Sequence, residues 1–307
     1  MIEGYIPKNE RKKILLLCDD IRMHSGIATM AREFVVNLSH KDNWFQLGAA
    51  LKHPDQGKTF DISQDVGKKI GINDADVKVM PWNGYGDAGV IRNLGVKEDL
   101  VMINYLGVDD DSINESEPLN RAFDAVFIGR LHESKGIFDI VPIWQKIVDK
   151  LPNATLGVVG MAEQTIKKAF ESQIRNAKLE KNIIILGYHI GKDAYAYLKS
   201  SKVFFFPSHE EGFGIVIAEA MTAGSAVVTY DLEVYKETFS SSIYTAKCFD
   251  CSDFADKVIC LLEDENLRLD IVSGAKELAK NFTWKNCAKR EYREINKTFL
   301  KKIKFSA

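Results

Sequence analysis

The chain alternates short apolar runs, rich in β-branched residues, with longer amphipathic stretches. Long crossover connections of this kind join parallel strands, so the alternation predicts an α/β fold with parallel sheets. The run 13–18 has no polar alternation, which predicts a central strand buried on both faces. The pattern is most regular after residue 123. There it predicts strands at 125–128, 155–159, 182–186, 203–206, 226–229 and 242–244.

The predicted helices fill the intervals between these strands, which gives one complete doubly wound domain. They span 138–151, 163–177, 192–200, 215–223 and 234–238, and three more, 253–262, 265–280 and 284–302, close the chain. Weaker strands are predicted at 45–51, 77–80 and 100–103. The polar stretch 108–118 is typical of a linker. We therefore expect two domains, 1–120 and 121–283, followed by a closing helix at 284–307.

Composition excludes several classes of protein. The 307 residues carry 41 Lys and Arg against 43 Asp and Glu, a net charge of −2, with 46% hydrophobic and 27% charged residues. These values are typical of an ordinary globular protein of one or two domains, without a global basic surface for nucleic acid or anionic membrane. No run approaches 18 apolar residues, and residues 1–13 lack the apolar segment of a signal peptide. We expect a cytoplasmic protein without a membrane span.

The five cysteines are few, odd in number and scattered, which argues against a disulfide framework. Cys248 and Cys251 form a CxxC pair, but no second pair of ligands lies at zinc-site spacing. We interpret them as incidental thiols before a helix, and we expect no metal site.

The strongest chemical motif is the segment 206–221, in which a strand ends, a Gly-containing turn follows and a helix begins near Gly214. This is the ligand crevice of a doubly wound sheet, where free backbone N–H groups can hold an anion. Glu211 in the turn and Glu219 on the helix could both point into it and accept hydrogen bonds from sugar hydroxyls. The alternative for Glu219 is a solvated helix face, which its apolar neighbours make less favourable. For Glu210 we favour the solvated position.

A second motif, 127–137, is again a strand, a turn and the start of a helix, with Arg130 and Lys135 in the turn. A bidentate guanidinium and an ammonium at a crevice mouth can bind a diphosphate. Taken alone, the motif also fits an ordinary exposed basic loop.

Together the two motifs resemble the retaining glycosyltransferases of family 4, which have the GT-B fold of two facing Rossmann-like domains. The resemblance implies that both domains here are Rossmann-like and that the N-terminal one is abbreviated. The Glu-x7-Glu pair corresponds to Glu211 and Glu219, and the Gly-Arg…Lys-Gly loop to Arg130 and Lys135. The resemblance covers about 94–298 and includes the interdomain segment 104–109 and the Phe-Thr-Trp sequence at 282–284.

The resemblance implies a role for each residue. Arg130 and Lys135 would neutralise the departing nucleotide diphosphate without a metal, Glu219 would bind the ribose and Glu211 the donor sugar. His189 would lie near the nucleobase, although a solvated loop position fits it equally well. His132 and His209 flank the motifs, and exposed loop positions are favoured for both. The expected donor-binding set is Gly26, Gly129, His189, Gly212, Phe213, Gly214, Ile215 and Glu219, with Arg130, Lys135 and Glu211 as catalytic residues.

The first half resembles the family less closely. Gly26 matches the glycine loop that approaches donor phosphates and acceptor, and Arg22 or His24 could contact either. The stretch 19–65 is similar to bacteriophage-type members. Only ~100 residues precede the linker, which is short for this domain. An acceptor site could therefore be minimal, completed by another subunit, or lost.

The sequence thus predicts a retaining hexosyltransferase that uses a nucleotide-diphosphate sugar, most commonly a uridine diphosphate (UDP) sugar, and no cofactor. The acceptor is open: a glycan, a lipid, a small molecule or a modified DNA base. The main alternative is a non-catalytic nucleotide-sugar-binding remnant of such an enzyme. A nucleotide-sugar epimerase of the same architecture is less favoured, because the first half offers few acid–base residues.

Overall fold

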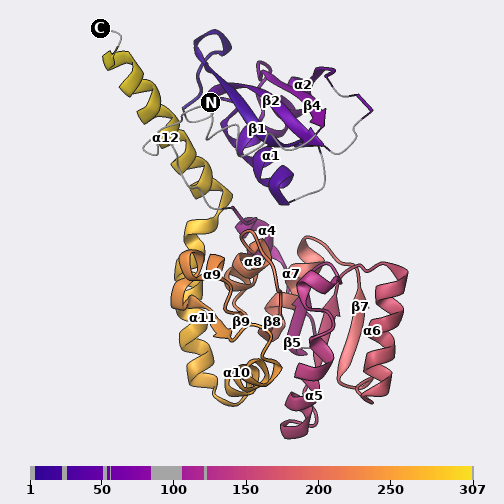
Figure 1. Cartoon of the computed structure of the whole chain (residues 1–307). Helices are drawn as coiled ribbons and strands as arrows, with labels where there is room; N and C mark the ends of the chain where they lie inside the picture. The colour runs from indigo at the N-terminus through magenta and orange to yellow at the C-terminus, as the bar shows by residue number, and fades with distance from the viewer. Residues whose placement is uncertain are drawn as a thin grey trace. The chain divides into compact units, whose positions relative to one another are not determined.

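The computed structural model describes residues 4–22, 26–50, 54–55, 57–83, 106–120 and 123–305. These residues form two compact units (Figure 1). The N-terminal unit consists of Met1–Gly107 together with Trp284–Ala307, and the C-terminal unit is Val108–Thr283. The chain therefore returns to the first unit after completing the second.

The C-terminal unit is built on a six-stranded parallel sheet with the order β10-β9-β8-β5-β6-β7. Since β5 comes first in the chain and β8 fourth, the sheet grows outward in both directions from this pair, which is the Rossmann order. Val126 of β5 lies opposite Phe204 of β8. The strands are β5 (Phe123–Ile128), β6 (Leu156–Val159), β7 (Ile183–Gly187), β8 (Ser201–Phe206), β9 (Ala226–Tyr230) and β10 (Tyr244–Ala246).

Helices cover both faces of this sheet (Figure 1). They are α4 (Asp110–Glu115), α5 (Ile140–Lys150), α6 (Gln164–Asn176), α7 (Lys192–Lys199), α8 (Ile215–Ala223), α9 (Glu233–Thr238), α10 (Cys251–Glu263) and α11 (Glu265–Ala279). Helix α8 packs against α4, α7, α11 and β9, which explains why its sequence is apolar on nearly all sides. Helix α10 packs against α5.

Aromatic side chains fill the core of the C-terminal unit. Every residue of β9 is buried, as are Phe204, Phe205 and Phe206 of β8. The Phe205 ring meets Trp144 of α5 edge-on, with centroids 5.7 Å apart. Burying such side chains is worth about 1.5–3 kcal/mol each, so the central strands are held firmly and the loops at their ends start from fixed positions.

The N-terminal unit contains a four-stranded sheet with the order β1-β2-β4-β3, and helices α1 and α12 pack against each other beside it. Its core includes Phe34, Trp44, Val77 and Cys287, the last contributed by α12. The elements are β1 (Lys12–Asp19), α1 (Gly26–Leu38), β2 (Asp42–Ala50), β3 (Phe60–Asp61), α2 (Ser63–Ile70), β4 (Val77–Asn83) and α12 (Trp284–Phe305).

The predicted α/β architecture with parallel sheets is confirmed, with two local differences in the N-terminal unit. Leu15 of β1 is 63% exposed, and within the described residues β1 pairs with β2 alone, so the prediction of a strand buried on both faces is wrong. The two-residue edge strand β3 runs antiparallel to β4. The strand predicted at 100–103 lies outside the described residues.

The linker proposed at 108–118 contains helix α4, which packs against α7 and α8 and so belongs to the C-terminal unit. Short polar sequences do not reveal such packing. No helix among the described residues is long and apolar enough to cross a membrane.

Candidate functional site

The loops that follow β5 and β8 meet at the carboxyl ends of these adjacent strands. The backbone N–H of His209 donates to the carbonyl oxygen of Ser134 over 2.9 Å, and the hydroxyl of Ser208 lies 3.2 Å from the same oxygen. The two motifs, about 75 residues apart in the chain, therefore form one structure at the point where the strand order reverses. This is where open α/β sheets bind their ligands.

Gly136 allows the two loops to approach each other. It ends a short 3₁₀ helix, Glu133–Lys135, in a left-handed conformation with φ of +69°. A Cβ atom at this position would overlap the backbone carbonyl oxygen of Pro207, directly after β8. Both the backbone conformation and the lack of space require glycine here.

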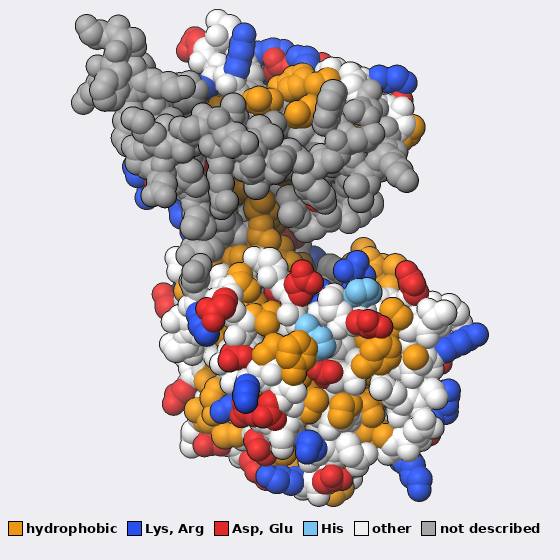
Figure 2. Space-filling model, in the orientation of Figure 1, with side chains coloured by type: hydrophobic (Ala, Val, Ile, Leu, Met, Phe, Trp, Pro, Cys, Tyr) orange, Lys and Arg blue, Asp and Glu red, His pale blue; other side chains and the backbone are white. Residues whose placement is uncertain are grey.

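Lys135 and Glu211 form an ion pair across this junction. The Lys135 Nζ lies 2.7 Å from Glu211 Oε1 and 3.0 Å from the carbonyl oxygen of Glu210, and the hydroxyl of Ser208 donates to Glu211 Oε1 over 3.1 Å. The side chains of Lys135 and Glu211 are only 20% and 13% exposed. The Glu210 side chain is exposed, as expected. Figure 2 shows acidic and histidine side chains close together on this unit's visible face.

A second polar network lies beside the ion pair. Asp139, just before α5, accepts hydrogen bonds at Oδ2 from His209 Nε2 and from the buried hydroxyl of Tyr230, each over 2.8 Å. Burial and the Asp139 carboxylate raise the pKa of Tyr230, which keeps this hydroxyl a donor. His209 is half-buried, so the exposed position favoured from the sequence is wrong. The network ties the loop after β8 to α5 and β9.

The start of α8 presents backbone donors. Gly214 precedes the helix with φ of +89°, and a Cβ there would come within 3.1–3.2 Å of Ile217 and Tyr235 side-chain atoms. The first bond of the helix is made by Ile217, whose N–H donates to the Gly214 carbonyl. The N–H groups of Ile215 and Val216 come before it, where helix N–H groups have no intrahelical acceptor.

Glu219 is half-buried on α8, and its environment is unlike that of Glu211. Its Oε1 accepts a hydrogen bond from the hydroxyl of Tyr195 over 3.1 Å. Loss of hydration raises the pKa of Glu219 to about 7, and the nearby Asp109 carboxylate adds to the shift. The solvated helix face weighed from the sequence does not describe this residue. At neutral pH, protonated and ionised forms coexist.

The other predicted residues of the C-terminal unit are less enclosed. Arg130 is exposed and forms no ion pair within the described part of the chain. The N–H of Gly129 donates a hydrogen bond to the Val159 carbonyl oxygen over 3.1 Å. Gly212 is exposed, and Phe213 packs against Phe239 and Phe282.

His189 follows β7 and is half-buried. Its Nε2 lies 3.1 Å from the carbonyl oxygen of Leu186, and its ring lies beside that of Tyr197, with centroids 5.1 Å apart. His132 is exposed, as expected, and its Nδ1 accepts the N–H of Ser134 over 3.2 Å.

The predicted residues of the N-terminal unit are only partly visible. Gly26 begins α1, and His24 lies outside the described residues. Arg22 forms a two-fold contact with Asp20, Nε to Oδ1 at 2.9 Å and Nη2 to Oδ2 at 2.6 Å, and its guanidinium lies 4.2 Å from the Phe60 ring centroid. The Arg22 guanidinium is therefore engaged by Asp20 and Phe60, which both belong to the N-terminal unit.

Several residues of the site were missed in the sequence. Tyr195, Ser208, Asp139 and Tyr230 contact the predicted residues directly, but each lies on a different element or is a common residue in a loop. A weak signal existed only for Ser208, which stands inside the motif, and for Asp109, which ends the quoted interdomain segment. The others needed the tertiary structure.

Among the described residues, no group of His, Cys, Asp and Glu side chains has the arrangement of a metal site. Cys248 and Cys251 are free thiols, and Cys251 is the first residue of α10.

The comparisons with known proteins agree with this geometry. The family model of the glycosyl transferases group 1 matches residues 109–278, more than half of the chain. CapM of Staphylococcus aureus, a capsular polysaccharide biosynthesis glycosyltransferase, is 27% identical over 198 residues, covering 63% of this chain and 51% of CapM. Three of the curated relatives are matched over 24%, 51% and 59% of their own lengths, so the chain spans less than two thirds of each.

Two solved structures extend the likeness over most of the chain. A glycosyltransferase from Rickettsia africae ESF-5 has a TM-score of 0.69 at 15% identity, covering 95% of this chain and 99% of that one. Anabaena Alr3699/HepE, solved in complex with UDP, has a TM-score of 0.61 at 17% identity, covering 93% and 79%. At these identities the likeness shows a shared fold, and GT-B neighbours are consistent with two Rossmann-like domains.

Replacing Gly136 with alanine tests the loop junction. We expect Gly136→Ala to destabilise the protein by about 3 kcal/mol or more, because the new Cβ overlaps the Pro207 carbonyl in addition to the left-handed strain. The control Gly187→Ala has a similar φ of +84° and open space around the Cβ, so it should cost only about 1 kcal/mol. Urea unfolding measures both, and equal losses would contradict the close approach.

The raised pKa of Glu219 makes stability depend on pH. Its value of about 7 lies above the ordinary 4.5, so the folded state binds the proton more tightly, and the Glu219 contribution to stability falls as pH rises between these values. Glu219→Gln keeps an oxygen for Tyr195 and removes this dependence. We expect the loss of unfolding free energy from pH 5 to pH 8 to be about 2 kcal/mol smaller in the variant.

Urea unfolding of both proteins at several pH values provides the measurement. Asp42, whose pKa burial raises to about 6, contributes in the same direction, but it is present in both proteins and cancels in the difference. Parallel pH profiles for the two proteins would show that Glu219 is not desolvated.

Proposed function

The chain belongs to the glycosyl transferases group 1 family, and from this premise we propose that it is a retaining glycosyltransferase of family 4. It would move a hexosyl unit from a nucleotide-diphosphate sugar to a hydroxyl acceptor. The observation that carries the proposal is the junction of the loops after β5 and β8. There Lys135 pairs with Glu211, the chain continues from Glu211 into the first N–H groups of α8, and Glu219 lies further along that helix.

The two glutamates suit the two ends of a sugar nucleotide. A carboxylate accepts hydrogen bonds from neighbouring hydroxyls, so Glu219 would hold the ribose and Glu211 the donor sugar. Tyr195 fixes the orientation of Glu219 through its hydrogen bond. A vicinal diol donates to the ionised form, so binding would draw Glu219 away from its protonated state.

Lys135 has a donor left for the diphosphate. An ammonium group has three donors, and Glu211 and the Glu210 carbonyl occupy two of them. The third, with the exposed Arg130 guanidinium and the N–H groups of Ile215 and Val216, would stabilise the charge that develops as the diphosphate leaves. The proposed transfer uses no cofactor.

The mechanism we propose is front-face transfer with retention. The bond between the anomeric carbon and the diphosphate oxygen breaks, the acceptor hydroxyl attacks from the same face, and the leaving diphosphate takes the acceptor proton. A protein base is then unnecessary. UDP is the proposed leaving group, and its presence in the HepE complex, a protein of the same fold, supports that choice.

Acceptor binding would then fall to the N-terminal unit, whose described sheet is small. A glycan, a lipid, a small molecule and a modified DNA base stay open as acceptors. The alternative function, a non-catalytic binder of nucleotide sugars, is favoured by the contacts that occupy Arg22.

Substitutions at the junction test catalysis. We expect Lys135→Ala and Glu219→Ala each to lower sugar transfer or donor hydrolysis by about 10²–10³-fold, because each removes a group aimed at the donor. Lys202→Ala, on the same unit but paired with Asp124, is the control and should keep full activity. Product analysis by mass spectrometry provides the rates, and unchanged turnover in both site variants would refute the assignment.

Donor binding and turnover together separate the two functions. A panel of nucleotide sugars at about 100 times their Kd should stabilise the folded protein by about 2.7 kcal/mol, which a thermal-shift assay detects. A stabilising donor that is also slowly hydrolysed indicates an enzyme. Stabilisation without hydrolysis or transfer to any acceptor in the panel indicates the binding protein.

A further inference from the structure

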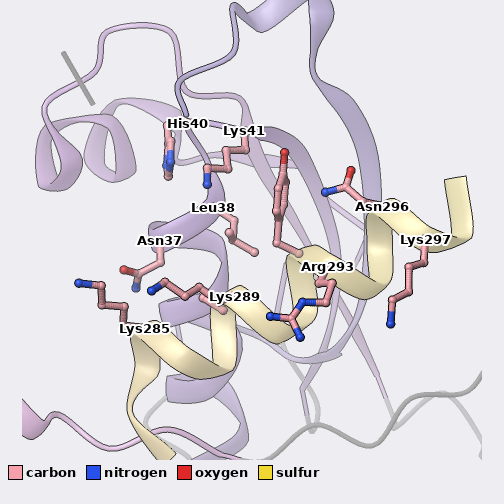
Figure 3. Close-up of a pocket in the computed structure, with 11 residues that line it drawn as sticks. Asn37, Leu38, His40, Lys41, Lys285, Lys289, Arg293, Asn296 and Lys297 are labelled. Atoms are coloured by element: carbon pink, nitrogen blue, oxygen red, sulfur yellow. The ribbon is translucent and has the colours of Figure 1, made fainter. Parts of the chain in front are cut away.

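A basic groove lies in the N-terminal unit, between the end of α1 and the exposed face of α12 (Figure 3). Its volume is about 660 Å³. Leu38, Ala288 and Tyr292 contribute apolar atoms to its lining, and the amides of Asn37 and Asn296 lie near its two ends. Both walls belong to the N-terminal unit, whereas the junction at Lys135 belongs to the C-terminal unit.

The cations of α12 in this groove follow a strict helical spacing. Lys285, Lys289, Arg293 and Lys297 are each four residues apart. Residues four apart lie on one face of a helix and rise about 6 Å along its axis, so the four charges form a row about 18 Å long. Figure 3 shows these side chains following the helix along the groove.

Three of the four cations in this row have no ion-pair partner among the residues that the structure describes. Lys297 pairs with Glu294 over 2.5 Å, but Lys285, Lys289 and Arg293 form no ion pair with any described residue. All three are exposed. Three like charges on adjacent turns repel one another, and this arrangement is destabilising unless an anion lies among them.

The opposite wall adds another cation. Lys41, just after α1, places its Nζ 4.7 Å from the Tyr292 ring centroid, which fixes the amine at the groove. The buried carboxylate of Asp42 is next to Lys41 in the chain. Burial raises the pKa of Asp42 to about 6, which still leaves the carboxylate mostly ionised at neutral pH. Asp42 therefore offsets part of the Lys41 charge. The strongest positive potential therefore lies along Lys285, Lys289 and Arg293.

We propose that this groove binds a linear ligand that carries several phosphate groups in a row, such as a phosphodiester chain. Lysine supplies point charges and arginine a planar fork, and both suit phosphate oxygens. A row of charges at regular intervals favours a chain with repeated phosphates over a single phosphate. A groove with two walls favours an inserted chain over a flat membrane surface. The proposal does not depend on sugar transfer.

Binding of inorganic tripolyphosphate, compared with orthophosphate, tests the proposal in the full chain. We expect tripolyphosphate to bind at least 10-fold more tightly and to weaken steeply with added salt, as multivalent anion binding does. The charge-reversing pair Lys289→Glu and Arg293→Glu should reduce its affinity at least 10-fold. Isothermal titration calorimetry measures the affinities.

Two controls make the result specific. Lys168→Glu with Lys181→Glu makes the same charge change on exposed positions of the C-terminal unit, and should leave the affinity unchanged. Lys135→Ala should also leave it unchanged, which separates the groove from the junction. Should the charge-reversed protein fail to fold, Lys289→Gln with Arg293→Gln replaces it, with a smaller loss expected.

Other outcomes overturn the proposal. Equal affinities for the two phosphates would indicate a single-anion site. An equal loss in the Lys168/Lys181 control would indicate diffuse charge. Vesicles of phosphatidylcholine with phosphatidylglycerol provide the last comparison: binding to them that needs Lys289 and Arg293, without tripolyphosphate binding, would identify a membrane surface instead.

Discussion

The candidate site depends on the pairing of β5 with β8 at the centre of the C-terminal sheet. These strands are first and fourth in their domain, so loops about 75 residues apart in the chain leave the sheet side by side. Gly136 then lets the backbone of one loop rest on the Pro207 carbonyl of the other. Without this approach, Lys135 would not reach Glu211. The geometry of the site therefore depends on the close approach of two backbone segments, at Gly136 and Pro207.

The two glutamates of one motif lie in different electrostatic surroundings. Glu211 has an ammonium partner in Lys135 and a hydroxyl donor in Ser208. Glu219 has lost hydration, has only a tyrosine hydroxyl as donor and faces the charge of Asp109, so its pKa rises to about 7. Their eight-residue spacing places one in a turn and the other on a helix enclosed by α4, α7 and α11. That packing, rather than the motif itself, sets the difference.

Helix α12 has one buried face and one exposed face. Cys287 and Ala288 enter the core of the N-terminal unit, and Trp284 meets Phe34 edge-on, so the end of the described chain stabilises its beginning. The other face carries the exposed side chains of Lys285, Lys289, Arg293 and Lys297 and lines the basic groove. A near-neutral net charge of −2 conceals this local concentration of positive charge.

Much was determined by the sequence alone. Hydrophobic periodicity was sufficient for the parallel sheets and for the helix Ile215–Ala223, because these patterns are local. The order of strand, turn and helix in each of the two motifs was also predicted, since these elements are contiguous in the chain. The tertiary structure decided the exposure of Leu15 and the partners Tyr195, Asp139 and Tyr230, which come from other elements. It also decided that His209 is half-buried and that Glu219 is desolvated, because burial and pKa depend on neighbours that are distant in the chain.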